Sequence, residues 1–152
     1  MILAHGRLYD SSEQETILQS LEEEINHTRA VQRLDPDTVI RAVDRLAQEV
    51  RAGRYDARIA SLEVEGADRY KELAISMMSQ ESLRYQLRTE LGDLSWSEPT
   101  RLTPPDGLPG IESRVLPLCP LFHIAAGNVD GLPAFSVAEG LLTGNINILK
   151  LP

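Results

Sequence analysis

The strongest constraint on the fold lies near the end of the chain, where two short apolar runs flank an apolar segment of helix length. The runs are residues 121–125 and 146–149, and the segment between them, residues 132–143, is followed by Gly144. Both runs are continuous rather than alternating, as expected of strands covered on both faces. Residues 121–150 together have the length of a β-strand–helix–β-strand unit with a right-handed crossover. We therefore expect two parallel strands joined by a buried helix.

The region before residue 95 has helical periodicity. Ser12 and Glu15 have the spacing of a capping box before an apolar stripe, and Asp35 followed by Pro36 is a favourable helix entry. Steps of three and four between apolar residues continue after each start. We expect three or four helices here. Their remaining boundaries are predicted at Gly53, Gly66, Ser79 and Gly92.

Prolines and glycines dominate residues 95–120, which are predicted to form a connector or a short hairpin. Within it, residues 100–103 can pair as a short strand, and residues 111–118 are either an edge strand or a lead-in to the sheet. The chain thus divides into a helical segment (1–94), this connector (95–120) and a βαβ unit (121–152). The predicted class is α/β.

Composition excludes several classes of protein. The net charge is −8, and the Lys and Arg residues are scattered, which argues against a nucleic-acid partner. The longest strongly apolar stretch, residues 132–142, is too short to span a membrane and contains Glu139, and residues 1–6 lack a signal-peptide layout, so we expect a cytoplasmic protein. The single cysteine, Cys119, allows neither an internal disulfide nor a cysteine-rich metal site, and we expect no metal.

Two polar residues follow the predicted parallel strands, at the edge where open α/β sheets bind ligands. Asn128 comes just after the first strand and Lys150 ends the second. An asparagine amide there can donate a hydrogen bond to a developing oxyanion, and a lysine can meet a ribose hydroxyl or a phosphate. Because GxGxxG and P-loop motifs are absent, residues 127–131 are equally compatible with an ordinary turn, and Lys150 with a solvated lysine.

Four short strings in residues 117–152 agree in order and spacing with a known family. They are FHIAAGNV (122–129), GLPAFS (131–136), GLLTGN (140–145) and ILKLP (148–152). This quarter of the chain resembles the LuxC-type acyl-CoA reductases, which belong to the aldehyde dehydrogenase superfamily. The helical region before it is consistent with such enzymes but would not identify them.

The resemblance implies that residues 121–152 are the first βαβ unit of a Rossmann-type nucleotide-binding domain, truncated here. It also implies an NADPH-dependent oxidoreductase that converts a fatty acyl-CoA, or another acyl thioester, to an aldehyde. In the superfamily a cysteine thiolate forms an acyl thioester, hydride from the nicotinamide gives a thiohemiacetal, and its collapse releases the fatty aldehyde.

The resemblance also implies roles for individual residues. Asn128 falls at the position of the asparagine that stabilises the oxyanion. Lys150 falls where a lysine lies near the adenosine ribose, and it can favour NADP through the 2′-phosphate. Ala126 and Gly127 fall within the cofactor site.

The sequence departs from the family pattern because it ends before the nucleophilic cysteine. Cys119 is not a substitute, since it precedes the first strand and has no evident neighbouring base or cation. We therefore expect an N-terminal fragment that is inactive alone. The alternative is a short, non-catalytic binding or assembly module of the same fold, in which the unpaired C-terminal strand forms a homo-oligomer.

Several other residues have simpler structural interpretations. His123 is expected to be a core histidine with its hydrogen bonds satisfied, and Cys119 a buried small residue. Met77 and Met78 are assigned to the core. Glu139 is either the partner of a basic group or an exposed residue at the edge of its helix.

Overall fold

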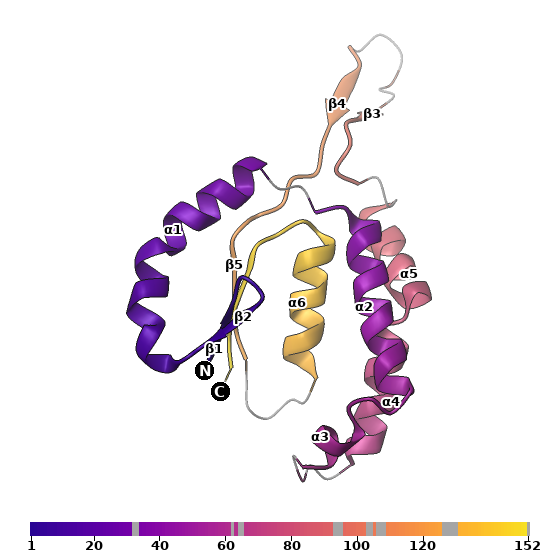
Figure 1. The fold of residues 1–152 in the computed structure, drawn as a ribbon. Coiled ribbons are helices and arrows are strands. Elements are labelled where there is room, and N and C mark those ends of the chain that lie inside the picture. The colour runs from indigo at the N-terminus through magenta and orange to yellow at the C-terminus, as the bar shows by residue number, and fades with distance from the viewer. Residues whose placement is uncertain are drawn as a thin grey trace. The chain divides into compact units, whose positions relative to one another are not determined.

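The computed structural model describes residues 1–31, 34–61, 63, 66–92, 96–102, 105, 109–125 and 131–151. The chain divides into two compact units, Met1–Arg33 and Leu34–Pro152, which are described separately. The fold is a mixed one of helices and small sheets, so the predicted α/β class is confirmed at that level (Figure 1). No helix within the described ranges combines the length and the apolar character needed to cross a membrane.

The first unit is a β-hairpin followed by a long helix. Strands β1 (Ile2–Ala4) and β2 (Arg7–Tyr9) pair antiparallel, and the 3-10 turn η1 (Ser11–Glu13) leads into α1 (Gln14–Val31). The capping box predicted at Ser12 and Glu15 is wrong. Asp10 accepts from the Ser12 N–H at 3.0 Å, and the Asp10 N–H donates to Glu13 at 2.9 Å, because the first turn begins before Ser12.

The second unit begins with four helices, two of which start at a side-chain cap. Asp35 caps α2 by accepting from the Thr38 N–H, and Ser79 caps α5 by accepting from the Ser82 N–H, so both predicted starts are confirmed. The count of three or four helices is wrong, since five α-helices precede residue 95 in the described ranges. The four in this unit are α2 (Pro36–Arg51), α3 (Asp56–Ala60), α4 (Ala67–Met77) and α5 (Gln80–Leu91).

The core of this unit gathers around α2, which contacts α4, α5 and α6 (Leu132–Leu142). Ile40 and Leu142 are its most deeply buried large side chains, at 0% and 2% exposure. The Arg84 guanidinium donates to Asp37 at 2.6 Å and ties α5 to α2. The core residues are Val39, Ile40, Leu83, Leu87, Trp96 and Leu142.

One predicted core residue lies on the surface. Met77 is exposed, so its assignment to the core is wrong, while Met78 is half-buried. The buried side chain of α4 is Ile75, because the face that α4 turns to its neighbours runs through that position. Apolar residues on α4 are too numerous for periodicity alone to identify the buried face.

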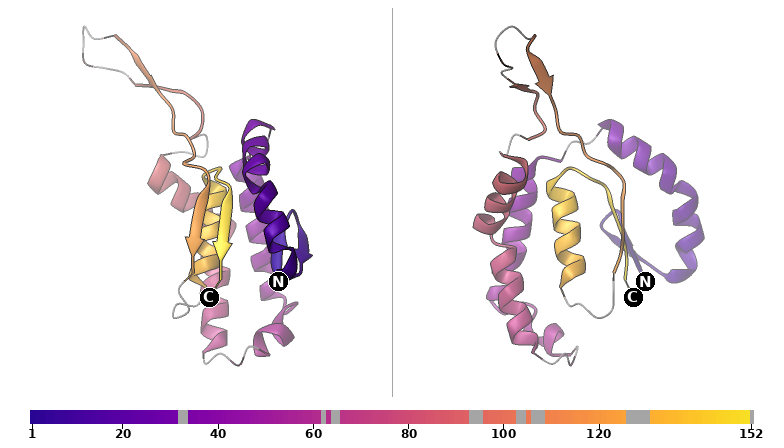
Figure 2. Two further views of the ribbon diagram at one scale, coloured as in Figure 1. Left: turned by 90° about the vertical axis from the view of Figure 1, so that its left-hand side faces the viewer. Right: turned by 180° about the vertical axis from the view of Figure 1, so that it is seen from behind.

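The predicted βαβ unit is present. Strands β5 (Leu121–Ile124) and β6 (Asn147–Lys150) pair parallel, and α6 connects them and packs on one face of the pair (Figures 1 and 2). Gly144 ends the helical segment with a φ of 73°. Phe122 and Ile124 are 63% and 72% exposed, so the prediction that both faces of the strands are covered is wrong for the described residues.

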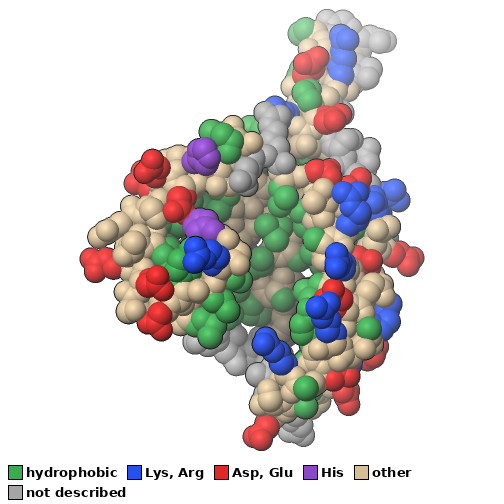
Figure 3. Space-filling view, viewed as in Figure 1, with side chains coloured by type: hydrophobic (Ala, Val, Ile, Leu, Met, Phe, Trp, Pro, Cys, Tyr) green, Lys and Arg blue, Asp and Glu red, His purple; other side chains and the backbone are tan. Residues whose placement is uncertain are grey.

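A second hairpin lies between the helices and the βαβ unit. Strands β3 (Thr100–Leu102) and β4 (Ile111–Ser113) pair antiparallel, as the predicted short strand and edge strand require. The Arg114 Nε donates to the Ser97 carbonyl at 2.7 Å and joins the two ends of this hairpin. Basic and acidic side chains are interspersed over the visible face of α2 and α5, in keeping with the scattered charges of the sequence (Figure 3).

The cap of α2 predicts a specific acid sensitivity. The Thr38 hydroxyl and N–H donate to the Asp35 carboxylate and lower its pKa from the usual 3.8. A carboxyl group whose pKa is lower in the folded than in the unfolded state stabilises the fold fully at pH values above its unfolded-state pKa. This stabilisation is lost as the pH falls through its folded-state pKa. Asp35→Asn keeps an accepting oxygen but does not titrate, so its stability should fall less steeply than that of the wild type.

Urea unfolding between about pH 5 and about pH 2 measures this difference in slope. Glu72→Gln, which changes an exposed carboxylate of α4, is the matched control and should follow the wild-type curve. Equal slopes for wild type and Asp35→Asn would contradict the assignment.

Candidate active site at the carboxyl edge of the sheet

The register of β5 and β6 brings the end of β5 next to Lys150. Ile124 pairs with Lys150, and the Ala125 N–H donates to the Lys150 carbonyl at 2.9 Å. Ala125 is the last described residue before the 126–130 stretch. The strand ends are therefore adjacent, as predicted. Asn128, Ala126 and Gly127 themselves lie outside the described residues, and their roles stay predictions.

Lys150 is exposed at this edge. Its Nζ donates to the Leu151 carbonyl at 3.5 Å, a long contact, and it forms no ion pair with any residue that the structure describes. Strand alternation places its side chain on the same face as Ile124, opposite α6. An ammonium group in this situation can bind a phosphate or hydroxyl group of a ligand.

Helix α6 begins at the same edge of the sheet (Figure 1). Gly131 precedes it with a φ of 78°, a conformation that favours glycine, and Pro133 lies in its first turn. The N–H groups of a first helical turn carry partial positive charge, which suits an anionic ligand. The edge thus combines a helix N-terminus and an exposed lysine.

Behind this edge, His123 joins the three elements of the βαβ unit. Its Nδ1 lies 2.7 Å from the Ser136 hydroxyl of α6, and its Nε2 lies 2.8 Å from Oδ1 of Asn147 on β6. The side chain is half-buried, and both ring nitrogens have partners, which confirms the expectation of a satisfied histidine. We call His123, Ser136 and Asn147 the His123 network.

Two further residues support this network. Asn145 is 6% exposed; its Oδ1 accepts from the Cys119 N–H at 2.8 Å and its Nδ2 donates to Thr143 at 2.8 Å. Gly140 faces Asn147, and a Cβ added at Gly140 would overlap the Asn147 side chain. Asn147 was not among the predicted functional residues, although a polar residue inside an otherwise apolar strand indicates a hydrogen-bond partner.

Cys119 lies at the wrong end of β5 to act at this edge. It is half-buried rather than buried as predicted, and it precedes the strand that Ala125 follows. Four strand residues span roughly 13 Å, so its thiol is far from Lys150. Among the described residues, no group of three or more histidine, cysteine or acidic side chains is arranged to bind a metal ion.

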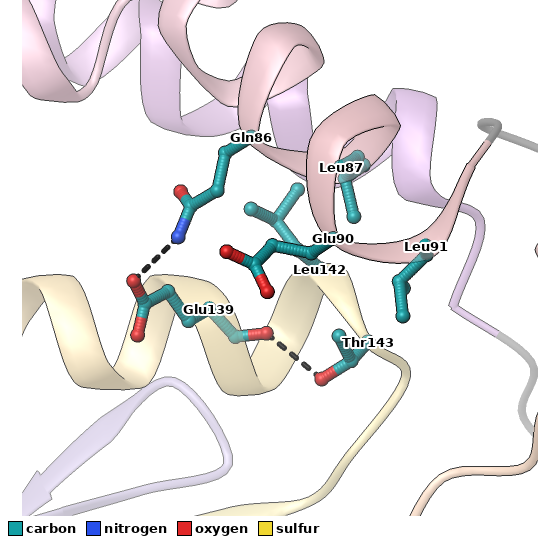
Figure 4. Close-up of a pocket in the computed structure, with 7 residues that line it drawn as sticks. All are labelled: Gln86, Leu87, Glu90, Leu91, Glu139, Leu142 and Thr143. Carbon is teal, nitrogen blue, oxygen red and sulfur yellow. Dashed lines mark hydrogen bonds between the residues drawn. The ribbon is translucent and has the colours of Figure 1, made fainter.

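A groove of about 390 Å³ lies between α5 and α6, toward the C-terminal end of α6 (Figure 4). Its acidic side chains, Glu90 and Glu139, are unsuited to the phosphates of a CoA thioester or a dinucleotide. Glu139 is exposed and accepts from the Gln86 amide at 2.6 Å. Of the two predicted alternatives, an exposed residue is therefore correct, and among the described residues no basic group pairs with it. The groove is lined by Gln86, Leu87, Glu90, Leu91, Glu139, Leu142 and Thr143.

Comparison with known families assigns the chain. The family model described as acyl-CoA reductase (LuxC) matches residues 31–152, which are 122 of the 152 residues. The chain belongs to the LuxC acyl-CoA reductase family. The match includes α2 to α5 as well as the βαβ unit, so it extends well beyond the strings that carried the resemblance. Searches of curated proteins and of solved structures gave no significant match.

The close contact at Gly140 gives a direct test of this packing. Gly140→Ala adds a Cβ against Asn147, and we expect it to lower the free energy of unfolding by ~1–3 kcal/mol, as overpacked cores do. Helix propensity alone would make this variant more stable, because alanine is favoured over glycine in helices by about 1 kcal/mol. A loss of stability therefore points to the contact with Asn147. Ala134→Gly, at an exposed position of α6, measures that propensity term in the same helix. A Gly140→Ala variant more stable than wild type in urea unfolding would contradict the packing.

Proposed function

We propose that this member of the LuxC family serves the NADPH-dependent reduction of a fatty acyl-CoA, or another acyl thioester, to an aldehyde. The observation that carries the proposal is the hydrogen bond from the Ala125 N–H to the Lys150 carbonyl at the carboxyl edge of a βαβ unit, in a chain of this family. In open α/β sheets this edge is where nucleotides bind. The proposed localisation is cytoplasmic.

The residues of the edge suit an anionic dinucleotide. The Lys150 ammonium is exposed and has no ion-pair partner among the described residues, so it can meet the 2′-phosphate of NADPH. The N-terminus of α6, after Gly131, favours a pyrophosphate, and Ala126 and Gly127 are proposed to line the same site. When bound, NADPH supplies the hydride. These features support residues 121–152 as the opening βαβ unit of a Rossmann-type domain of the aldehyde dehydrogenase superfamily.

Asn128 is proposed to stabilise the oxyanion that develops on the acyl carbon. Its side-chain amide is a neutral donor, and in the sequence it follows the last residue of β5 by four positions. The position of Cys119 before β5 makes it unsuitable as the nucleophile beside Asn128. We therefore assign the nucleophilic cysteine to a segment other than residues 1–152.

The exposed sheet face favours one second candidate, a non-catalytic binding or assembly module. Phe122 and Ile124 are largely exposed on the face opposite α6, and a two-stranded sheet is marginally stable by itself. In this case β6 would pair with a second copy of the chain. Light scattering tests it, since a strictly monomeric protein with an ordered β6 would exclude the assembly role.

Lys150→Met tests the cofactor assignment. Losing a charged hydrogen bond to the 2′-phosphate should raise the Kd for NADPH by about 10- to 100-fold and leave the Kd for NADH nearly unchanged. Fluorescence titration of both dinucleotides measures the ratio. Lys71→Met is the matched control, because Lys71 is the only other lysine and pairs with Asp56 at 2.6 Å. Equal losses for NADPH and NADH in Lys150→Met would refute a contact with the 2′-phosphate.

Asn128→Ala tests the oxyanion assignment in a form of the protein that includes the nucleophilic cysteine. Removing one oxyanion donor should lower kcat by about 10²- to 10³-fold with little change in KM. Asn26→Ala, at an exposed position of α1, is the matched control. Residues 1–152 alone should not oxidise NADPH in the presence of acyl-CoA. Such activity would show that the nucleophile has been assigned to the wrong segment.

A further inference from the structure

The hydrogen-bond directions in the His123 network are determined by its outermost members. The Asn147 Nδ2 donates to the Asn145 carbonyl at 2.9 Å, which leaves the Asn147 Oδ1 as the acceptor for His123. The His123 Nε2 must therefore carry a proton. In a neutral imidazole Nδ1 is then an acceptor, and the Ser136 hydroxyl donates to it. Every polar group in the network has a defined partner and direction.

This network distinguishes the native strand register most clearly from a slip of one residue. His123 pairs with Leu149 and Asn147 pairs with Leu121, so both polar side chains lie on the face covered by α6. The other residues of the two short strands, Lys150 excepted, are apolar and pack without strict direction. A slip of one residue would turn one of the two side chains to the opposite face and break their hydrogen bond. A slip of two residues would either set His123 directly opposite Asn147 or move the two a further roughly 7 Å apart along the strands, and either shift changes the geometry of their hydrogen bond.

The same register fixes the carboxyl edge of the sheet. It pairs Ile124 with Lys150 and directs the Ala125 N–H to the Lys150 carbonyl. We propose that His123 is a positioning residue: through Asn147 it sets the β5–β6 register and so places Lys150 beside the end of β5 at Ala125, where it can meet the dinucleotide phosphate. This inference rests on the proposed function, and it gives His123 no contact with cofactor or substrate.

Two substitutions separate positioning from space filling. His123→Gln retains a donor at about the position of Nε2 and can still meet Asn147, whereas His123→Phe fills the space without a hydrogen bond. In the intact protein, we expect the Kd for NADPH to rise at least about tenfold in His123→Phe and no more than about threefold in His123→Gln. A merely structural role would lower Tm in the variants and leave the Kd of the folded protein unchanged, which would overturn the proposal.

A double-mutant cycle tests whether His123 acts through Lys150. In a Lys150→Met background, His123→Phe should weaken NADPH binding little further, because the group that it positions is already absent. If His123→Phe weakened NADPH binding equally in the wild-type and Lys150→Met backgrounds, the proposal that His123 acts through Lys150 would be overturned. The cycle uses NADPH itself as the titrant, with Tm recorded for every variant.

Hydrogen exchange separates failure of this inference from failure of the proposed function. The Ala125 amide should be protected in the wild type and in His123→Gln, and should lose protection in His123→Phe. Equal protection of Ala125 in all three proteins would overturn the role of His123 in the register. If the wild type does not bind NADPH, the proposed function fails, and the exchange of Ala125 still decides whether His123 sets the register.

Discussion

Helix α6 is the element on which the arrangement of the second unit depends, because it is packed on two sides. Ala138 and Leu142 are buried, and Leu142 joins the core formed with α2 and α5. Ser136 and Gly140 face the strands, where they meet His123 and Asn147. A helix that is apolar nearly all round is stable only when it is covered in this way. Its position determines where both strands of the βαβ unit lie.

The two sides of α6 differ in kind. Toward α2 and α5 the contacts are apolar and without direction, and they stabilise the unit through burial. Toward the sheet the contacts include hydrogen bonds with fixed donors and acceptors, which distinguish one register from another. The contacts of α6 with the sheet help to set the strand register, and that register places Lys150 and Ala125 at the carboxyl edge. In this fold the candidate site is positioned by residues that do not belong to it.

Local sequence signals predicted the elements well where a chemical group defines a boundary. Asp35, Ser79 and Gly144 mark ends of helical segments through a cap or a positive φ, and these are decided within a few residues of chain. Short elements were missed, since α3 and the hairpin of β1 and β2 have too few residues to show a period. The choice of Ile75 over Met77 as the buried side chain of α4 was also missed, because it depends on where the neighbouring helices lie.

The sequence by itself determined the βαβ unit, its two polar strand ends and the family, because these are written in contiguous strings of residues 117–152. Only the tertiary structure decided that Asn147 and Ser136 are the partners of His123, that Gly140 makes room for Asn147, and that one sheet face stays exposed in the described residues. The physical reason is that hydrogen-bond partners and packing neighbours come from segments distant in the chain. Periodicity identifies the face of an element, but it does not identify what that face meets.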